Sequence, residues 1–65
     1  MAWLAKCIDG TEYIFDREPY KEEGYWYNPR RWDGDTIKLP KGTIEKIIGK
    51  EFKWNDNPVE IKEDK

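Results

Sequence analysis

The 65-residue sequence contains no histidine, serine or glutamine, and Cys7 is its only cysteine. Without serine and histidine a serine-type catalytic triad cannot form, and Cys7 has no imidazole to activate its thiol. Zinc sites of the Cys/His kind and an internal disulfide are excluded for the same reason. Carboxylates, lysines and tyrosines are the only catalytic groups left. We therefore expect a non-enzymatic protein with no cofactor and no metal.

Long apolar segments are also missing from the sequence. No stretch has the length and hydrophobicity of a signal peptide or a membrane span, so we expect no membrane association. A single cysteine is typical of proteins kept in a reducing compartment. These two features together predict a cytoplasmic protein.

The charge is high but nearly balanced, with a net charge of −2 from 12 basic and 14 acidic residues. Residues 30–53 hold seven basic and four acidic groups and are the only basic part of the chain. An acidic overall balance disfavours non-specific nucleic-acid binding, which relies on neutralising phosphates. A local site for an anion remains compatible with the basic middle of the chain.

A chain of this length has little core material. A domain of about 60 residues buries only about 60% of its unfolded surface, and disulfides, metals or a partner subunit often make up the shortfall. Neither a disulfide nor a metal is available here. We therefore expect an aromatic-rich core and a homodimer formed through an exposed hairpin face or a sheet edge.

The spacing of three isoleucines predicts one short helix at about residues 43–48. Ile44, Ile47 and Ile48 fall on one helical face, and we expect all three to dock on strands. Thr43 is the expected N-terminal cap, because its hydroxyl can accept a hydrogen bond from a free backbone N–H. Gly49 can adopt the left-handed conformation that ends a helix.

The first hairpin is predicted from the Asp9-Gly10 dipeptide between two apolar segments, 2–8 and 11–15. Asp-Gly favours a two-residue type I′ turn, which would place Ile8 opposite Thr11 and Leu4 opposite Phe15. Both faces of this hairpin carry apolar residues. The sheet is therefore covered on both sides, or it uses one side to meet a partner.

The rest of the chain alternates short strands with turns. We expect a polar loop over 16–24, strands at 25–27, 36–39, 51–54 and 59–61, and a turn at 55–58. In the strand at 36–39, Ile37 and Leu39 should face inward. This pattern predicts a single domain, residues 1–65, that is mainly β, with five to six strands and the one short helix. Two architectures fit: a small SH3-like barrel and a curled antiparallel sheet.

Several segments of the chain also resemble those of known proteins. The residues concerned are Asp9–Phe15, Glu18-Pro19, Trp26-Tyr27, Leu39–Ile44, Trp54 and Pro58–Glu60. With them the chain resembles short uncharacterised proteins of Bacteroides-type bacteria and their phages. The resemblance implies a small β protein from a bacterial or mobile-element setting, and it implies no activity and no functional residue.

One cluster has the composition of a binding site. Its members are two aromatic strand residues and the loop that follows them: Tyr25, Tyr27, Arg30, Arg31 and Trp32. Aromatic faces stack on planar groups, arginine binds phosphate or carboxylate in a bidentate manner, and Trp, Tyr and Arg are enriched at interaction hot spots. The structural alternative is that Trp26 and one tyrosine pack in the core and the arginines pair with Asp33 and Asp35 at the surface.

Two functions are compatible with this cluster. The first is a binding protein that acts on a protein partner through its aromatic and arginine surface. The alternative is a protein of phage or mobile-element origin that binds or sequesters a small nucleotide-like anion, in a pocket made by Tyr25, Tyr27, Trp32 and one of the two arginines. The sequence leaves both open.

Overall fold

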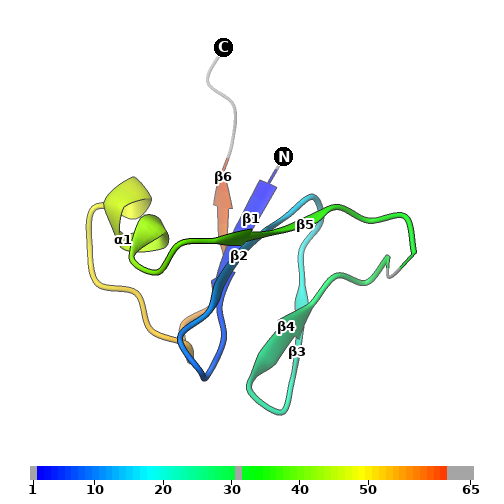
Figure 1. The fold of residues 1–65 in the computed structure, drawn as a ribbon, viewed down its shortest axis with the longest axis horizontal. Coiled ribbons are helices and arrows are strands. Elements are labelled where there is room, and N and C mark those ends of the chain that lie inside the picture. Colours follow the sequence, from blue (N-terminus) through cyan, green and yellow to red (C-terminus); the bar gives the residue numbers. More distant parts are fainter. Residues whose placement is uncertain (1, 31, 62–65) are drawn as a thin grey trace.

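The computed structural model describes residues 2–30 and 32–61, and within them it contains six strands and one helix (Figure 1). In chain order the elements are β1 (Ala2–Lys6), β2 (Glu12–Phe15), β3 (Tyr20–Glu22), β4 (Tyr25–Tyr27), β5 (Thr36–Leu39), α1 (Thr43–Ile48) and β6 (Val59–Ile61). Among the described residues, no helix has the length and hydrophobicity to cross a membrane.

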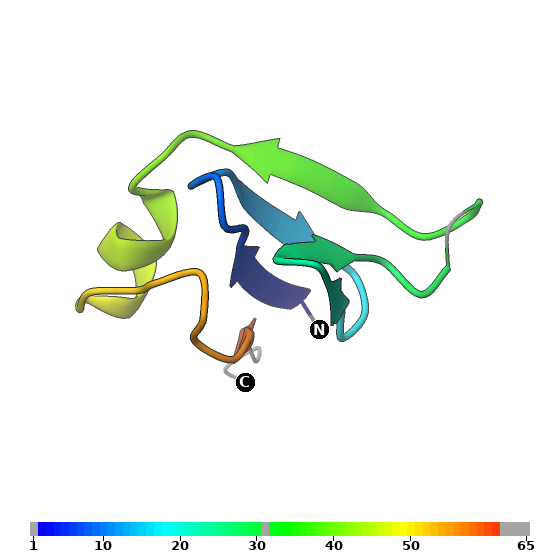
Figure 2. The ribbon, with the colours of Figure 1, turned by 90° about the horizontal axis from the view of Figure 1, so that it is seen from below.

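The strands form two antiparallel sheets. Four of them pair in the order β5-β2-β1-β6, so that β5 and β6 are the edges (Figure 2), and β3 pairs with β4 in a two-stranded ribbon. The predicted mainly β fold with one helix at 43–48 is confirmed. Within residues 2–30 and 32–61 the sheets do not close into a barrel, so the curled antiparallel sheet is the architecture observed.

The turn between β1 and β2 differs from the predicted two-residue turn. The N–H of Cys7 donates to Thr11 O at 2.8 Å, and the N–H of Gly10 donates to Cys7 O at 2.9 Å. These bonds close a three-residue loop, in which Gly10 has a φ of 91° and Asp9 Oδ1 accepts bonds from the N–H and the hydroxyl of Thr11.

The longer loop shifts the pairing of β1 and β2 by one residue. Leu4 lies opposite Ile14, and Trp3, not Leu4, lies opposite Phe15. Because side chains alternate along a strand, such a shift moves every side chain of β2 to the other face of the sheet. Tyr13 and Phe15 therefore share a face with Ala5, which is the pairing partner of Tyr13.

Each face of the four-stranded sheet is covered by a different element. Coverage on both sides was one of the two outcomes that the apolar faces of the first hairpin predicted. On one face Leu4 packs with Ile44 of α1 and with Phe52. Five partly buried side chains surround this core: Ile14, Leu39, Ile48, Val59 and Ile61. The β3–β4 ribbon lies on the side of the sheet away from α1 (Figure 1), and Ala5 and Cys7 are buried there.

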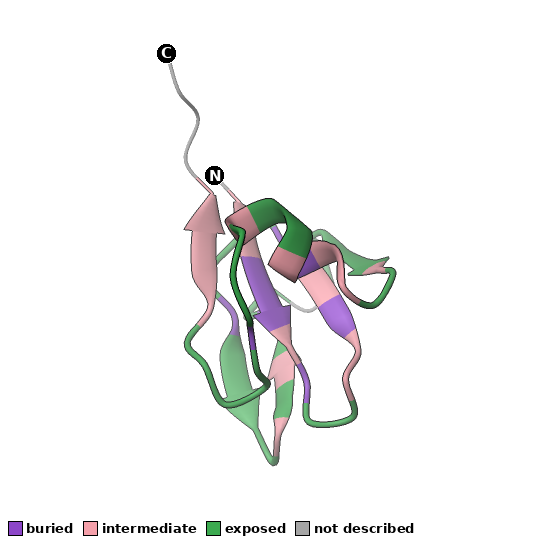
Figure 3. Ribbon diagram, turned by 90° about the vertical axis from the view of Figure 1, so that its left-hand side faces the viewer, coloured by how far each residue is buried: buried purple, intermediate pink, exposed green. Residues whose placement is uncertain are grey.

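Two isoleucines predicted to face inward are exposed. Ile44 is fully buried, but Ile47 is 53% exposed, because α1 contacts the sheet along the line through Ile44 and Ile48 and Ile47 lies to one side of it. Ile37 is 61% exposed, since β5 is an edge strand. Figure 3 shows burial concentrated in the two central strands and an exposed outer side of α1.

The N-terminus of α1 is capped by a residue from β2, and not by Thr43 as predicted. Glu12 is fully buried, and its carboxylate accepts hydrogen bonds from the N–H of Gly42 at 2.8 Å and of Ile44 at 2.9 Å. Lys6 Nζ lies 3.7 Å from the same carboxylate. The Thr43 hydroxyl instead donates to Pro40 O. Gly49 ends the helix as predicted, with a φ of 78°.

Two further segments depart from the prediction. Residues 51–54 form no strand, because the main chain of Phe52 bonds to side chains: its N–H donates to Glu45 Oε2 and its carbonyl accepts from Lys6 Nζ. Residues 20–22, expected within a polar loop, form β3. The two-residue turn Glu23-Gly24, with positive φ at both positions, closes the β3–β4 ribbon and has the geometry of type I′.

The expected homodimer stays a prediction. In the described part of the chain, β5 and β6 each have one side without a strand partner. The edge of β5 also carries the exposed Ile37. If two copies associate through a sheet edge, we expect β5 to be that edge.

Replacing Glu12 tests the buried cap. Glu12→Ala leaves two backbone N–H groups without their acceptor and the Lys6 ammonium without its counter-charge, and we expect it to lower the free energy of unfolding by about 3–5 kcal/mol. Glu12→Gln keeps one carbonyl oxygen as an acceptor and should lose less, about 1–3 kcal/mol. Urea unfolding followed by tryptophan fluorescence measures both values. A loss below about 1 kcal/mol for Glu12→Ala would contradict this role.

The isoleucines of α1 provide a matched pair of variants. Ile44→Ala opens a cavity in the core and should lower the free energy of unfolding by about 2–5 kcal/mol. Ile47→Ala removes an exposed side chain from the same helix and should change it by less than about 0.5 kcal/mol. Equal effects of the two changes in urea titrations would show that α1 docks in a different orientation.

Candidate functional site

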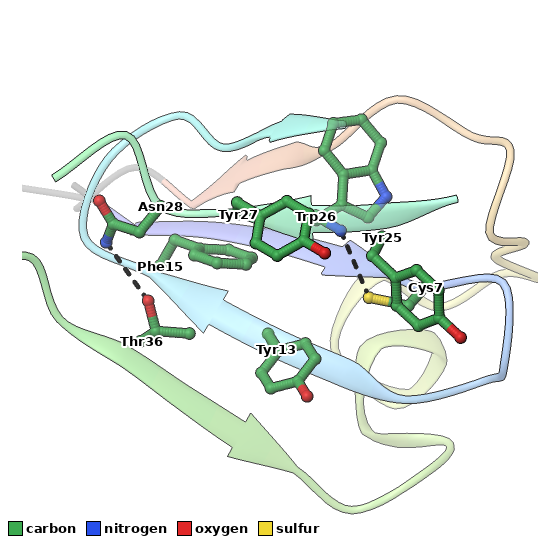
Figure 4. Close-up of a pocket in the computed structure, with 8 residues that line it drawn as sticks. All are labelled: Cys7, Tyr13, Phe15, Tyr25, Trp26, Tyr27, Asn28 and Thr36. Carbon is green, nitrogen blue, oxygen red and sulfur yellow. Dashed lines mark hydrogen bonds between the residues drawn. The ribbon is translucent and has the colours of Figure 1, made fainter. Parts of the chain in front are cut away.

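An open cleft lies between the β3–β4 ribbon and the outer half of the sheet (Figure 4). We call it the tyrosine cleft, and its volume is about 320 Å³. Eight residues from β4, β2, β5 and two connecting segments line it: Cys7, Tyr13, Phe15, Tyr25, Trp26, Tyr27, Asn28 and Thr36.

The two walls of the cleft follow from the alternation of side chains along their strands. Tyr25 and Tyr27 are two residues apart on β4 and therefore share one side of the ribbon. Tyr13 and Phe15 do the same on β2, with their ring centroids 6.0 Å apart. The cleft therefore has tyrosine rings on both walls, and these rings come from strands that are distant in sequence.

The ribbon is fixed to the end of β1 by three hydrogen bonds. The indole N–H of Trp26 donates to Lys6 O at 3.0 Å, the backbone N–H of Trp26 donates to Cys7 Sγ at 3.5 Å, and the N–H of Ile8 donates to Gly24 O at 2.8 Å. Cys7 is buried, as expected of a small core residue. A side chain at Gly24 would meet Ile8 at 2.9 Å, so glycine is required at this contact.

Lys21 packs against the ring of Trp26 on the side of the ribbon away from the tyrosines. The ammonium of Lys21 lies 5.5 Å from the ring of Trp26 and 5.2 Å from the ring of Trp54, within the range of cation–π attraction. This contact holds the segment that follows α1 against the ribbon. It leaves the tyrosine-bearing side of the ribbon as the one that faces the cleft.

Asn28 organises one end of the cleft. Its amide nitrogen donates to Asp16 Oδ1 at 2.8 Å, to Asp35 O at 3.2 Å and to Thr36 Oγ1 at 3.3 Å, and its Oδ1 accepts from the N–H of Arg30 at 2.8 Å. These bonds tie the end of β4 to the start of β5. Our sequence interpretation missed this role, because Asn28-Pro29 indicated only the end of a strand.

The four predicted site residues that the structure describes are not brought together. Tyr25 and Tyr27 line the cleft and are 39% and 40% exposed. Arg30 and Trp32 lie on the loop between β4 and β5 and do not line it, and Trp32 is 97% exposed. Arg31 lies outside the described residues. The aromatic half of the predicted cluster therefore belongs to the cleft, together with Tyr13 and Phe15, which our sequence interpretation had not included.

Arg30 is occupied by a local ion pair. Its Nε donates to Asp33 Oδ1 at 2.9 Å, and its Nη2 donates to Asp33 Oδ2. The bond to Asp33 raises the pKa of Arg30, and the same bond lowers the pKa of Asp33. This is the surface pairing that the sequence offered as the structural alternative for this arginine.

None of the described residues that line the cleft carries a charged side chain. The polar groups of Asn28 are already bonded, Thr36 Oγ1 accepts a bond from Asn28, and Cys7 Sγ accepts one from Trp26. In the part of the chain that the structure describes, the hydroxyls of Tyr13, Tyr25 and Tyr27 form no hydrogen bond with protein. These three hydroxyls, with the donor hydrogen of the Thr36 hydroxyl, are therefore the polar groups that the described part of the cleft offers to a ligand.

Comparison with protein-family models, with curated proteins and with solved structures finds no match to this chain. Among the described residues, no three His, Cys, Asp or Glu side chains gather where they could hold a metal ion. The chemistry of the tyrosine cleft is therefore the basis for proposing a function.

The bond between Asn28 and Asp16 predicts a pH dependence of stability. It lowers the pKa of the Asp16 carboxyl below its ordinary value, so the charged carboxylate is favoured in the folded state. The stabilisation is present above the unfolded pKa of about 4 and is lost as the pH falls through the lower folded value. We expect Asp16→Asn to make stability less sensitive to acid below about pH 4. Urea titrations near neutral pH and in this acid range measure the difference, and an unchanged acid dependence would contradict the assignment.

Proposed function

We propose that this is a non-enzymatic binding protein that contacts a protein partner through the tyrosine cleft. The observation that carries the proposal is the convergence of the rings of Tyr13, Tyr25 and Tyr27, beside the buried ring of Phe15, on an open cleft whose described lining residues are uncharged. Tyrosine and tryptophan supply a large contact area with few rotatable bonds, so little conformational entropy is lost when they are covered. A cytoplasmic, bacterial or mobile-element setting belongs to the same proposal and is supported by the single cysteine and the sequence resemblance.

The residues of the site are also held on hydrogen-bonded strands. Tyr25 and Tyr27 project from a strand, and the ribbon that carries them is bonded to Cys7 and Ile8 in the segment that follows β1. Binding residues held on strands are positioned more accurately than residues on loops. The cleft volume lies at the lower end of the range for ligand sites, roughly 300–1,000 Å³, which suits a few residues of a partner chain.

The alternative, a site for a nucleotide-like anion, has less support in the geometry. The described residues of the cleft wall include no cation, and the guanidinium of Arg30 is already bound to Asp33. Phosphate recognition normally depends on such cations or on backbone N–H groups. Base stacking on the tyrosines is the one feature in its favour.

A peptide-display selection with the folded protein as bait tests the proposal. We expect enriched peptides whose binding falls at least tenfold in the double variant Tyr25→Ala/Tyr27→Ala, since interface hot spots contribute more than about 1 kcal/mol each. The matched control is Arg30→Ala/Trp32→Ala, which alters the neighbouring loop and leaves the cleft intact. Thermal unfolding must show that both double variants fold.

Two outcomes would contradict the proposal. The first is a selection that yields no peptide dependent on Tyr25 and Tyr27. The second is a nucleotide that raises the melting temperature of the wild-type protein but not of the cleft variant, because a ligand that binds only the folded state stabilises it. The second result would establish the anion-binding alternative.

A further inference from the structure

We propose that the segment bound in the tyrosine cleft is an extended, proline-containing peptide in the polyproline II conformation. This inference rests on the proposed function and deepens it by naming the chemistry of the ligand. Proteins recognise peptides in a few recurring ways, and each way needs particular groups on the protein. The groups of the tyrosine cleft fit one of them.

Recognition by strand addition does not fit the cleft wall. A peptide that joins a sheet needs unpaired backbone groups along a strand. On β4, one side pairs with β3, and on the other side the N–H of Trp26 is bonded to Cys7 Sγ. A ligand in the cleft therefore meets side chains of β4 in place of a free strand edge.

Recognition of a helix or of a phosphorylated motif does not fit either. A helix with its side chains is about 10–12 Å wide. It needs a groove of larger volume than the roughly 320 Å³ of this cleft. A phosphorylated motif needs arginines, and the lining that the structure describes contains no charged residue. The bound part of the ligand is therefore narrow, extended and uncharged.

The aromatic walls match proline rings. The rings of Tyr13, Tyr25 and Tyr27 offer apolar surfaces on both sides of the cleft, as Figure 4 shows, and the buried ring of Phe15 lies beside them. Aromatic-lined grooves bind proline-rich segments, whose conformation is already formed before binding, so less entropy is lost on association.

The tyrosine hydroxyls match the backbone of such a peptide. A polyproline II segment has no internal hydrogen bonds, so its carbonyl oxygens remain available as acceptors. Tyr25 and Tyr27 are each about 40% exposed, and their hydroxyls, like that of Tyr13, have no protein partner in the described structure. Each hydroxyl can therefore donate a hydrogen bond to a peptide carbonyl while its ring contacts a proline.

A nuclear magnetic resonance titration of the isotope-labelled protein tests the inference. The probe is an oligoproline peptide with blocked ends, and the matched control is a glycine–serine peptide of equal length. We expect the oligoproline to cause saturable shifts of the amide signals of Tyr13, Tyr25 and Tyr27, and the control to cause none.

Two conservative variants test the hydroxyls. Tyr25→Phe keeps the ring and removes the donor, and it should weaken oligoproline binding by about 2- to 10-fold, the value of one neutral hydrogen bond. Tyr20→Phe is the control, because Tyr20 stacks on Tyr27 with centroids 5.8 Å apart but does not line the cleft. We expect Tyr20→Phe to bind as the wild type does.

The inference is overturned if oligoproline leaves these signals unchanged, shifts signals only elsewhere, or acts no differently from the glycine–serine peptide. It is also overturned if an uncharged oligosaccharide, which can stack on the same rings, shifts these signals and oligoproline does not. Peptides selected by display that depend on the cleft but contain no proline would overturn this inference alone. The proposed function would fail only if the selection yields no cleft-dependent peptide.

Discussion

The buried carboxylate of Glu12 is the interaction on which the rest of the structure depends. It joins β2 to the first turn of α1 through two hydrogen bonds, and α1, with six residues, is too short to be stable alone. The same contact requires the side chain of Glu12 to point to the α1 side of the sheet. Because side chains alternate along a strand, Tyr13 must then point to the other side, where it forms a wall of the tyrosine cleft. The cap of the helix and the position of the cleft are therefore two results of one constraint.

The features that the sequence predicted are those set by local patterns. The apolar spacing at Ile44 and Ile48 and the glycine at position 49 were sufficient to place α1, and the short strands at 25–27, 36–39 and 59–61 were found at their predicted bounds. The register of the first hairpin could not be predicted in this way. Asp-Gly is compatible with a two-residue and with a three-residue loop, and the choice here involves the bonds from Thr11 to Asp9 and the distant contact of Glu12 with α1. Because the loop is one residue longer than predicted, every side chain of β2 lies on the face of the sheet opposite to the predicted one.

The same limit explains which site residues were found. Tyr25 and Tyr27 were recognised because two aromatic residues in one short strand already share a side. Tyr13, Phe15 and Thr36 join them only through the register of β2 and the pairing of β5, which are long-range contacts. Arg30 and Trp32 were included because they are close in sequence. The short-range ion pair of Arg30 with Asp33 and the outward position of Trp32 remove both from the cleft.

The way the ribbon is attached links binding to stability. Charged residues make up 40% of the sequence, yet none of those that the structure describes lines the cleft, and several of them hold the fold together, as Glu12, Glu45 and Lys21 do. On the cleft side, Gly24 and Trp26 form the three hydrogen bonds that fix the ribbon to β1. A ligand that contacts Tyr25 on one wall and Tyr13 on the other would hold the ribbon and the sheet together and would stabilise the folded state by linkage. Conversely, a change that loosens the ribbon, such as a side chain at Gly24, would weaken binding without touching the ligand, because the competent arrangement of the two walls would be populated less often.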